Sequence, residues 1–487
     1  MPGQQEGATD AQLRELDRQR VAGEITDIGY HLQRNRLLIQ AGQQARGTVA
    51  GQPVLSMPAP PVVPGPVPPG GLGAYVALTG RRRSRLVILG ALAGLAAIAA
   101  GLILLVVRPF PRNFSIPAVS SATWTLVNSP NTGSGGNNLH SVACSAPGAC
   151  WAVGAYSTSA SHSPDRTLIE QDTQSGWVVV SSPDVGSGVN ELWSLACPSL
   201  HECWAVGEYF DVQHGINQTL IEYGSGSPVT WNVVSSPDVG SVDNELSGVA
   251  CPGPDDCWAV GQSGYGVNPE TLIEHNTGSG WVVVSSPNVG SIASDLDSVA
   301  CPTVDDCWAV GVYSYQYGVQ HSLVEHYSGG DWAVVDAPNP GSVDNWLDAV
   351  ACVDPAHCWA VGYFAQSRTA SADQFAHTLI VQYIGGAWGT VDSSNLFGDL
   401  EGVTCVSSAE CWAVGAEGNG SSTLIEQGNS GGWREVSSVP ANRAQSILGQ
   451  VLSVTCTAPS ECWAVGWRGG GPGAAKTLIA AGPAISS

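Results

Sequence analysis

From residue 124 to residue 481 the chain alternates short apolar runs with turns rich in Gly, Pro, Asn, Asp and Ser. One stretch shows four such runs in succession, at residues 192–197, 203–207, 219–222 and 231–235, and each run is rich in apolar, β-branched or aromatic residues. Runs of this length and composition, bounded by turn residues, predict short β-strands. The pattern therefore predicts structural units of four strands each.

This unit occurs seven times along the chain. Each copy contains two cysteines separated by five residues, and the second cysteine opens the sequence Cys-Trp-Ala-Val-Gly. The first cysteines of consecutive copies lie 50 to 54 residues apart. A fixed period of this length indicates a repeat architecture, and it matches the four-stranded blade of a β-propeller. The tryptophans at this fixed strand position are predicted core residues: Trp151, Trp204, Trp258, Trp308, Trp359, Trp412 and Trp463.

The two ends of the array predict how it closes. The last copy stops after its third run, Thr477–Ala480, whereas an unmatched run, Trp124–Pro130, precedes the first copy. An open solenoid would leave sheet edges unpaired at both ends, and a closed ring removes them. We therefore predict a mainly β fold, a seven-bladed β-propeller over residues 124–481, whose seventh blade takes its fourth strand from residues 124–130.

All fourteen cysteines belong to the repeated pairs. A zinc site needs four ligands, so each pair would have to recruit a second pair from another blade. A disulfide across the five-residue turn needs only hairpin geometry, and it stabilises by about 2 kcal/mol on the chain-entropy model. We predict one disulfide per blade and an oxidising compartment. The predicted pairs are Cys144 with Cys150, Cys197 with Cys203, Cys251 with Cys257, Cys301 with Cys307, Cys352 with Cys358, Cys405 with Cys411, and Cys456 with Cys462.

An uncharged run of 22 residues, Leu86–Val107, precedes the repeats. A helix of this length measures about 33 Å and spans a bilayer. Four arginines between residues 81 and 85 flank its amino end, against Arg108 and Arg112 beyond it, so the amino terminus is predicted to be cytoplasmic. We predict a bacterial, single-pass cell-membrane protein with an extracytoplasmic propeller. Its predicted parts are a helical hairpin at 1–47, a Pro/Gly-rich linker at 48–80, a transmembrane helix with its basic flank at 81–108, a tether at 109–123, and the propeller at 124–481.

Residues 9–39 predict the helical hairpin. Thr9 with Gln12 forms a capping-box pattern, and Thr26 can cap a second helix. The segment resembles the SHOCT-type two-helix module, although Gly29 stands where that family has Glu and Arg34 where it has Lys. The resemblance implies a homo-oligomer contact or a cytoplasmic protein partner, and a solvated juxtamembrane helix is the alternative. The matching residues are Leu13, Leu16, Gly23, Ile25, Thr26, Tyr30, Arg34, Leu37 and Leu38.

The repeat pattern Leu-x-Ser-Val-Ala-Cys, Cys-Trp-Ala-Val-Gly, Thr-Leu-Ile-Glu and Gly-x-Trp resembles sialidase-like propellers of the photosystem II assembly-factor type. Its blades are also similar in length to kelch blades. The resemblance implies an architecture that hosts both binding proteins and enzymes. It does not extend to a carboxylate-binding arginine cluster, because the arginines occupy no common blade position: Arg166, Arg368, Arg434, Arg443 and Arg468.

Charge is divided unequally along the chain. Residues 1–115 carry twelve Arg against six acidic residues, whereas residues 116–487 carry six basic and 35 acidic residues. The negative field of the second part repels nucleic acid and other anionic polymers, so we expect no nucleic-acid partner. The cysteines are fully used by the pairs, and we expect neither a metal nor a cofactor.

The loops between the second and third strands vary from seven residues (416–422) to fifteen (363–377), whereas the other turns keep nearly constant lengths. Binding residues usually lie on the variable loops of a scaffold. Aromatic residues open these loops, where they can stack on a saccharide or a peptide, or pack on the neighbouring blade. The candidate ligand-binding residues are Tyr209, Phe210, Tyr313, Tyr315, Tyr317, Tyr363 and Phe364.

Carboxylates occupy one inner-strand position, four residues before the first cysteine, in three adjacent units: Asp297, Asp348 and Glu401. They could hold a cation or act as acid and base, or simply face water. We expect a ligand-binding, sensing or interaction module, and we keep as alternatives a propeller glycosidase or lyase using these three residues and a passive envelope scaffold. A second set recurs in the third strand and is expected to be solvated or to bond between blades: Glu170, Glu222, Glu274, Glu325 and Glu426.

Overall fold

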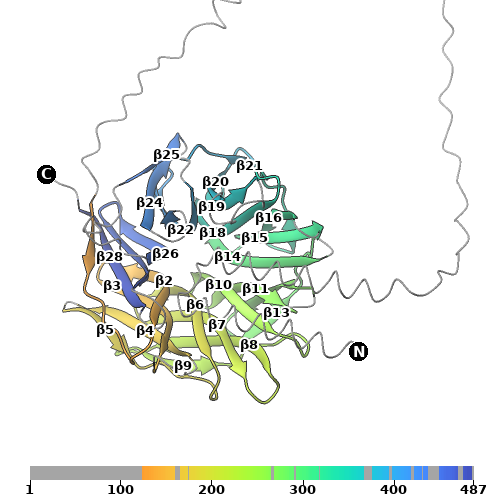
Figure 1. Cartoon of the computed structure of the whole chain (residues 1–487). Coiled ribbons are helices and arrows are strands. Elements are labelled where there is room, and N and C mark those ends of the chain that lie inside the picture. The colour runs from red at the N-terminus through yellow and green to blue at the C-terminus, as the bar shows by residue number, and fades with distance from the viewer. Residues whose placement is uncertain are drawn as a thin grey trace, which may run out of the picture. The chain divides into compact units, whose positions relative to one another are not determined.

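The computed structural model describes most of the chain from residue 123 to residue 484 (Figure 1). The predicted hairpin, linker and membrane helix all lie outside the described residues. Within the described part, no helix has the length and apolar character needed to cross a membrane. The segments left out of the description are 160–164, 174, 265–267, 290–291, 317–318, 367–375, 394–396, 418–421, 430, 437–448 and 470–474.

Twenty-eight strands form seven four-stranded antiparallel sheets in the described residues, one for each sequence repeat. We number the blades along the chain and list the strands of each from first to fourth. Blades 1 to 4 are blade 1 with β2 (Asn137–Ala146), β3 (Ala149–Ser157), β4 (Asp165–Thr173) and β5 (Gly176–Val180); blade 2 with β6 (Asn190–Ser199), β7 (Glu202–Asp211), β8 (Ile216–Ser225) and β9 (Thr230–Val234); blade 3 with β10 (Asn244–Gly253), β11 (Asp256–Ser263), β12 (Glu270–Asn276) and β13 (Trp281–Val284); and blade 4 with β14 (Ala293–Thr303), β15 (Asp306–Gln316), β16 (Val319–Tyr327) and β17 (Trp332–Val334). Blades 5 to 7 are blade 5 with β18 (Asp344–Asp354), β19 (His357–Ala365), β20 (Ala376–Ile384) and β21 (Ala387–Thr390); blade 6 with β22 (Gly398–Ser407), β23 (Glu410–Glu417), β24 (Ser422–Asn429) and β25 (Gly432–Glu435); and blade 7 with β26 (Gly449–Ala458), β27 (Glu461–Arg468), β28 (Lys476–Ala484) and β1 (Thr123–Val127).

The sheets close into a ring. The first strand of each blade packs beside the first strand of the next, and β26 of blade 7 packs beside β2 of blade 1 (Figure 1). The unmatched amino-terminal run is β1, which pairs antiparallel with β28 and places Leu126 opposite Ala480. This pairing confirms the predicted closure of blade 7, and the seven-bladed propeller is the fold of the described part of the chain.

The hydrophobic core lies between neighbouring blades. Each core cluster of the repeated type joins residues of two adjacent sheets, as Trp151 of blade 1 does with Leu192 and Trp231 of blade 2. Trp151 meets Trp231 edge-on with ring centroids 5.6 Å apart, a favoured geometry for aromatic pairs. Six of the seven predicted core tryptophans are buried, and Trp463 is partly buried.

The glycine of Trp-Ala-Val-Gly is required by a close approach of backbones. A Cβ added at Gly207 would lie 2.0 Å from the carbonyl oxygen of Glu191 on the neighbouring strand. At the same level the pairing of the two strands shifts between Leu192 and Ser194, which leaves Trp193 in a β-bulge. This bulge recurs in every blade, and its residues are those four positions before the first cysteine: His140, Trp193, Ser247, Asp297, Asp348, Glu401 and Leu452.

The seven disulfides form within the blades, one in each, as predicted. Each closes the turn between the first and second strands, with Cα atoms 4.0 to 4.1 Å apart. In blade 5 the two cysteines, Cys352 and Cys358, are direct partners across the strand pair. The cross-links therefore reinforce single hairpins and join no blade to another.

Candidate functional site

The antiparallel order of the strands separates two faces of the ring. The disulfide-bonded turns and the turns between third and fourth strands lie at one end of the sheets, which we call the disulfide face. The loops between second and third strands, and the segments that cross from one blade to the next, lie at the opposite end. We call this end the variable-loop face. It carries the candidate ligand-binding aromatic residues.

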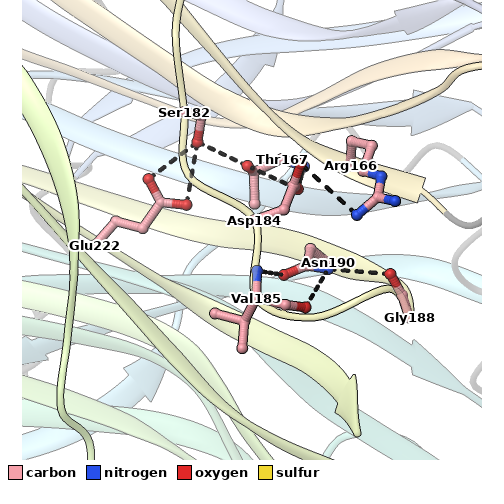
Figure 2. A network of polar contacts seen from close by, with 8 residues as sticks. All are labelled: Arg166, Thr167, Ser182, Asp184, Val185, Gly188, Asn190 and Glu222. Carbon is pink, nitrogen blue, oxygen red and sulfur yellow. Dashed lines mark hydrogen bonds and ion pairs between the residues drawn. The ribbon is translucent and has the colours of Figure 1, made fainter. Parts of the chain in front are cut away.

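Crossing segments on this face are held by a polar network, shown in Figure 2. Oγ of Ser182, beyond the last strand of blade 1, lies 3.1 and 3.0 Å from the two carboxyl oxygens of Glu222 in blade 2. The same oxygen lies 2.7 Å from Oγ1 of Thr167. The backbone N–H of Thr167 donates to Oδ1 of Asp184 over 3.1 Å. One serine thus links the third strands of two neighbouring blades.

This Thr–Ser–Glu link recurs at four further seams. The glutamate side chains are fully buried in every case, so the expectation of hydrogen bonds between blades is confirmed and that of solvated carboxylates is not. The recurring links are Thr477–Ser129–Glu170, Thr219–Ser236–Glu274, Thr271–Ser286–Glu325 and Thr378–Ser393–Glu426.

Burial raises the pKa of the glutamates Glu170, Glu222, Glu274 and Glu325 to about 8, and the serine hydrogen bonds offset only part of this rise. A carboxyl group with this pKa is largely protonated at neutral pH. Raised carboxyl pKa values often mark catalytic sites. Here each carboxyl group is bonded to a serine that links two blades, and the arrangement is repeated around the ring, so its role is structural.

In several crossing segments, an asparagine side chain forms hydrogen bonds with the backbone of the segment. Oδ1 of Asn190 accepts from the N–H of Val185 over 2.7 Å, while its Nδ2 donates to the carbonyls of Val185 and Gly188 (Figure 2). Asn244 and Asn345 make equivalent bonds at other seams. These contacts satisfy backbone groups that no sheet would satisfy, and they give the variable-loop face a fixed platform.

The three predicted carboxylates occupy the bulges of β14, β18 and β22, near the variable-loop end, and all are partly buried. Asp297 accepts a hydrogen bond of 2.8 Å from the indole N–H of Trp346 in the next blade. Asp348 lies against the backbone of β19, since a Cβ added at Gly362 would be 2.8 Å from its Oδ2. Each of these carboxylates therefore sits at the residue that the pairing of the inner two strands skips.

Tyr363 lies beside this group. Its side chain is 1 % exposed, and its hydroxyl is buried without a hydrogen-bond partner among the described residues. Burial raises its pKa well above the usual value, and the carboxylates of Asp344, Asp348, Asp399 and Glu401 add to this rise. The hydroxyl is thus close enough to sense carboxylates from blades 5 and 6. The sequence left open whether Tyr363 stacks on a ligand or packs against a neighbouring blade, and the structure places it in the interior.

The other candidate aromatics differ in exposure. Tyr315 is 50 % exposed, and it meets the half-buried Tyr313 edge-on with centroids 5.1 Å apart. Phe364 is half-buried and stacks on His377 at 5.1 Å. Tyr209 and Phe210 are half-buried, and the Tyr209 hydroxyl donates to Gln218. Tyr317 lies outside the described residues.

Three further aromatic rings lie at this face that were not predicted from the sequence. His321 stacks on Tyr313 at 5.2 Å, and Phe397, which is 54 % exposed, lies 5.2 Å from His377. His321 and His377 face Tyr313 and Phe364 directly across the strand pairs β15–β16 and β19–β20. Extending the register outward from Trp-Ala-Val-Gly and Thr-Leu-Ile-Glu would have found both histidines. Phe397 gave no such signal, because it reaches His377 through an isolated bridge.

Within the described residues, no group of three or more His, Cys, Asp or Glu side chains is placed to hold a metal ion. The expectation that the protein uses neither metal nor cofactor stays a prediction.

Comparison with known proteins yields likenesses of fold only. No protein-family model and no curated protein matches the chain. YCF48 from Cyanidioschyzon merolae is similar at 15 % identity and a TM-score of 0.45, covering 74 % of this chain and 99 % of that one. A structure of YCF48 bound to D1 peptide is similar at 10 % identity and 0.46, covering 77 % and 100 %. Chaetomium thermophilum Sqt1 is similar at 12 % and 0.42, covering 74 % and 89 %.

Proposed function

We propose that this chain is a membrane-anchored interaction module whose propeller binds a peptide segment on the variable-loop face. The observation that carries the proposal is a pair of aromatic–histidine groups on the neighbouring blades 4 and 5. Tyr315 and Phe397 are each about half exposed there, and each rests on a ring system built from the strands beneath it. Exposed rings held on a fixed platform gain affinity because little conformational freedom is lost on binding.

A peptide suits this face better than a neutral saccharide. Carboxylates of three blades lie near the same end of the sheets as the aromatic groups. Residues 116–487 carry 35 acidic against six basic residues, so their field attracts ligands with positive charge. Peptides carry such charge in lysine and arginine side chains, and neutral saccharides do not.

Anchoring in a membrane rests on the sequence. The apolar run Leu86–Val107 is long enough to span a bilayer, and the arginines before it favour an amino terminus inside the cell. A propeller with a disulfide in every blade suits the oxidising side of that membrane. On this proposal the module displays its binding face outside the cytoplasm.

The test uses the full chain, purified in a mild detergent and probed on a peptide array and a glycan array. We expect peptide ligands, and we expect Tyr315→Ala combined with Phe397→Ala to weaken their binding about tenfold or more, since each stacked ring contributes roughly 1 kcal/mol. A matched control replaces two exposed apolar residues of the disulfide face, Leu200 and Val304, by Ala. Equal losses in both pairs, or binding to glycans alone, would contradict the proposal.

A further inference from the structure

Six carboxylates from three adjacent blades gather at the variable-loop end of the inner strands. They lie in the first halves of β14, β18 and β22, and they belong to Asp295, Asp297, Asp344, Asp348, Asp399 and Glu401. Asp295, Asp344 and Asp399 are buried, at 7 %, 1 % and 2 % exposure, while the three bulge carboxylates keep part of their surface in solvent. Negative charges on the inner strands of three adjacent blades attract a positive ligand to this part of the ring.

The second observation is the hydroxyl of Tyr363. It is enclosed, it has no hydrogen-bond partner among the described residues, and it lies within electrostatic range of Asp348, Asp399 and Glu401. An enclosed hydroxyl without a partner is unfavourable, because it has lost its hydrogen bonds to water. Native proteins keep such a group mainly where a ligand or an ordered water satisfies it. The unsatisfied hydroxyl and the carboxylates therefore mark the same place, between blades 5 and 6.

We propose that Asp348 and Glu401, with the hydroxyl of Tyr363 beneath them, bind the side-chain cation of a lysine or arginine in the peptide ligand. This inference rests on the proposed function, and it names the chemical group that the peptide must carry. An ammonium or guanidinium group donates several N–H bonds, which match two carboxylates and one hydroxyl oxygen. A bare metal ion fits less well, since no group of three metal-binding side chains is placed for one in the described part of the chain.

The surrounding structure fixes the two carboxylates. Both side chains project from bulges, at positions where the ladder of the sheet skips a residue. Gly362 lets Asp348 lie close to the backbone of β19, because any Cβ there would collide with its Oδ2. Trp346 lies over Tyr363, with ring planes 13° apart and centroids 6.4 Å apart. Residues held in this way lose little freedom on binding, so each removed contact is expected to have a measurable effect.

The first measurement leaves the protein unchanged. Fluorescein-labelled peptides of Gly and Lys, of Gly and Arg, and of Gly and Nε-acetyl-Lys are titrated against the full chain in detergent, with binding followed by polarisation. We expect the Lys or the Arg peptide to bind at least tenfold more tightly than the acetylated one, because acetylation removes the charge. Equal affinity for the charged and the acetylated peptides would overturn the inference.

The second measurement changes the site. Asp348→Asn combined with Glu401→Gln removes two charges and keeps the shapes, and we expect binding of the charged peptide to fall tenfold or more. The control pair, Asp255→Asn with Asp305→Asn, removes two exposed charges from the disulfide face and should change affinity less than twofold. Equal losses in both pairs would mean general charge attraction and would also overturn the inference.

A gentler variant tests the hydroxyl. Tyr363→Phe keeps the buried ring and deletes only the oxygen, so it is the informative change if the double carboxylate variant fails to fold. We expect a three- to tenfold loss of affinity for the charged peptide and an unchanged circular dichroism spectrum. Unchanged affinity in Tyr363→Phe together with unchanged affinity in Glu401→Gln would overturn the assigned site.

The two proposals fail in different ways. If array peptides bind but need no lysine or arginine, and if only the Tyr315 and Phe397 variant weakens them, the cation site is wrong while the interaction module stands. If no peptide binds at all, the proposed function itself is wrong. Saturable Ca²⁺ binding that the Asp348 and Glu401 variant abolishes, without any peptide binding, would replace the organic cation by a metal.

Discussion

The protonation state of Glu222 determines which hydrogen bonds Ser182, the serine that links two blades, donates and accepts. If Glu222 is protonated, its O–H can donate to Oγ of Ser182, the serine can donate to Oγ1 of Thr167, and the threonine can donate to Oδ1 of Asp184, which lies 3.4 Å away. Every oxygen in this chain then has a partner. If Glu222 were ionised, Ser182 would have to donate the hydrogen bond between these two residues, and a negative charge would lie in a fully buried place.

This chain of bonds predicts an unusual pH dependence. The pKa of Glu222 is about 8 in the fold against an ordinary value of 4.5, so its contribution to stability is fully present below about pH 4.5 and is lost as the pH rises through about 8. Each pH unit in that window removes on the order of 1 kcal/mol per glutamate. The folded protein should therefore be harder to unfold by urea at pH 5 than at pH 8.

Glu222→Gln isolates this effect, because the amide keeps a hydrogen bond to Ser182 and cannot ionise. We expect a smaller difference in unfolding free energy between pH 5 and pH 8 than in the unchanged protein, with most of the gain at pH 8. Asp255→Asn, at an exposed position of the disulfide face, serves as the control for overall charge. A pH difference as large in Glu222→Gln as in the control would refute the assignment.

At the scale of the blades, the seam between blades 4 and 5 shows what happens when the link is lost. Ala337 stands at the position of the serine, and Val381 stands at the position of the glutamate. Both join the hydrophobic cluster between these blades. Ser322, at the threonine position, is left with a buried hydroxyl that has no partner in the described residues. At this seam the serine and the glutamate are thus absent together.

This seam offers a test of coupling. Val381→Glu alone should destabilise by about 3 kcal/mol, because it buries a carboxyl group without a partner. Adding Ala337→Ser should recover roughly 1–2 kcal/mol by supplying the link to Ser322. Urea unfolding of the four proteins of this cycle measures the interaction energy. Strictly additive effects would show that the repeated triplet is three independent residues.

The sequence was sufficient to predict the blades, because the same local pattern of strands and turns is repeated seven times. Every unit carries the Trp-Ala-Val-Gly strand and its paired cysteines, so an error at one strand boundary would not change the predicted number of blades. The exposure of single aromatics was not predictable in this way. Tyr363 is buried beside Trp346, a residue for which the other blades have smaller or polar side chains, and the bulge next to it breaks the alternation that would assign a face.

The candidate site was partly visible for the same reason. A shared position in three units singled out Asp297, Asp348 and Glu401, and the bulge explains why that position is special. The hydroxyl of Tyr363 and the ring of Phe397 join the site through contacts between blades. Such contacts depend on the packing of unlike units, and no periodic pattern encodes them.

At the scale of the whole molecule, closure of the ring rests on one short strand. Trp124 of β1 is fully buried, and its ring meets Trp412 of blade 6 edge-on at 5.5 Å. Trp177 holds the equivalent place in blade 1, where it meets Trp463 at 5.3 Å. If the ring is closed, a terminal blade and an internal one should be equally sensitive to loss of this tryptophan.

We therefore expect Trp124→Ala and Trp177→Ala to destabilise to a similar extent, by about 3–5 kcal/mol each, the usual effect of such a deletion in a packed core. Thermal unfolding of the two variants provides the comparison. A mild effect at Trp124 beside a severe one at Trp177 would mean that β1 is only loosely attached and that the array is open in solution.

The same strand ties closure of the ring to synthesis of β28. β1 leaves the ribosome before any other strand of the ring, and its partner β28 leaves last; Asn131 and Thr477, which bond across this seam, are 346 residues apart. No product that stops before Lys476 can pair β1, so an unfinished chain exposes two strand edges. Unpaired edges of this kind make a partly folded chain prone to aggregation. Closure of the ring therefore requires that the chain has been synthesised through β28.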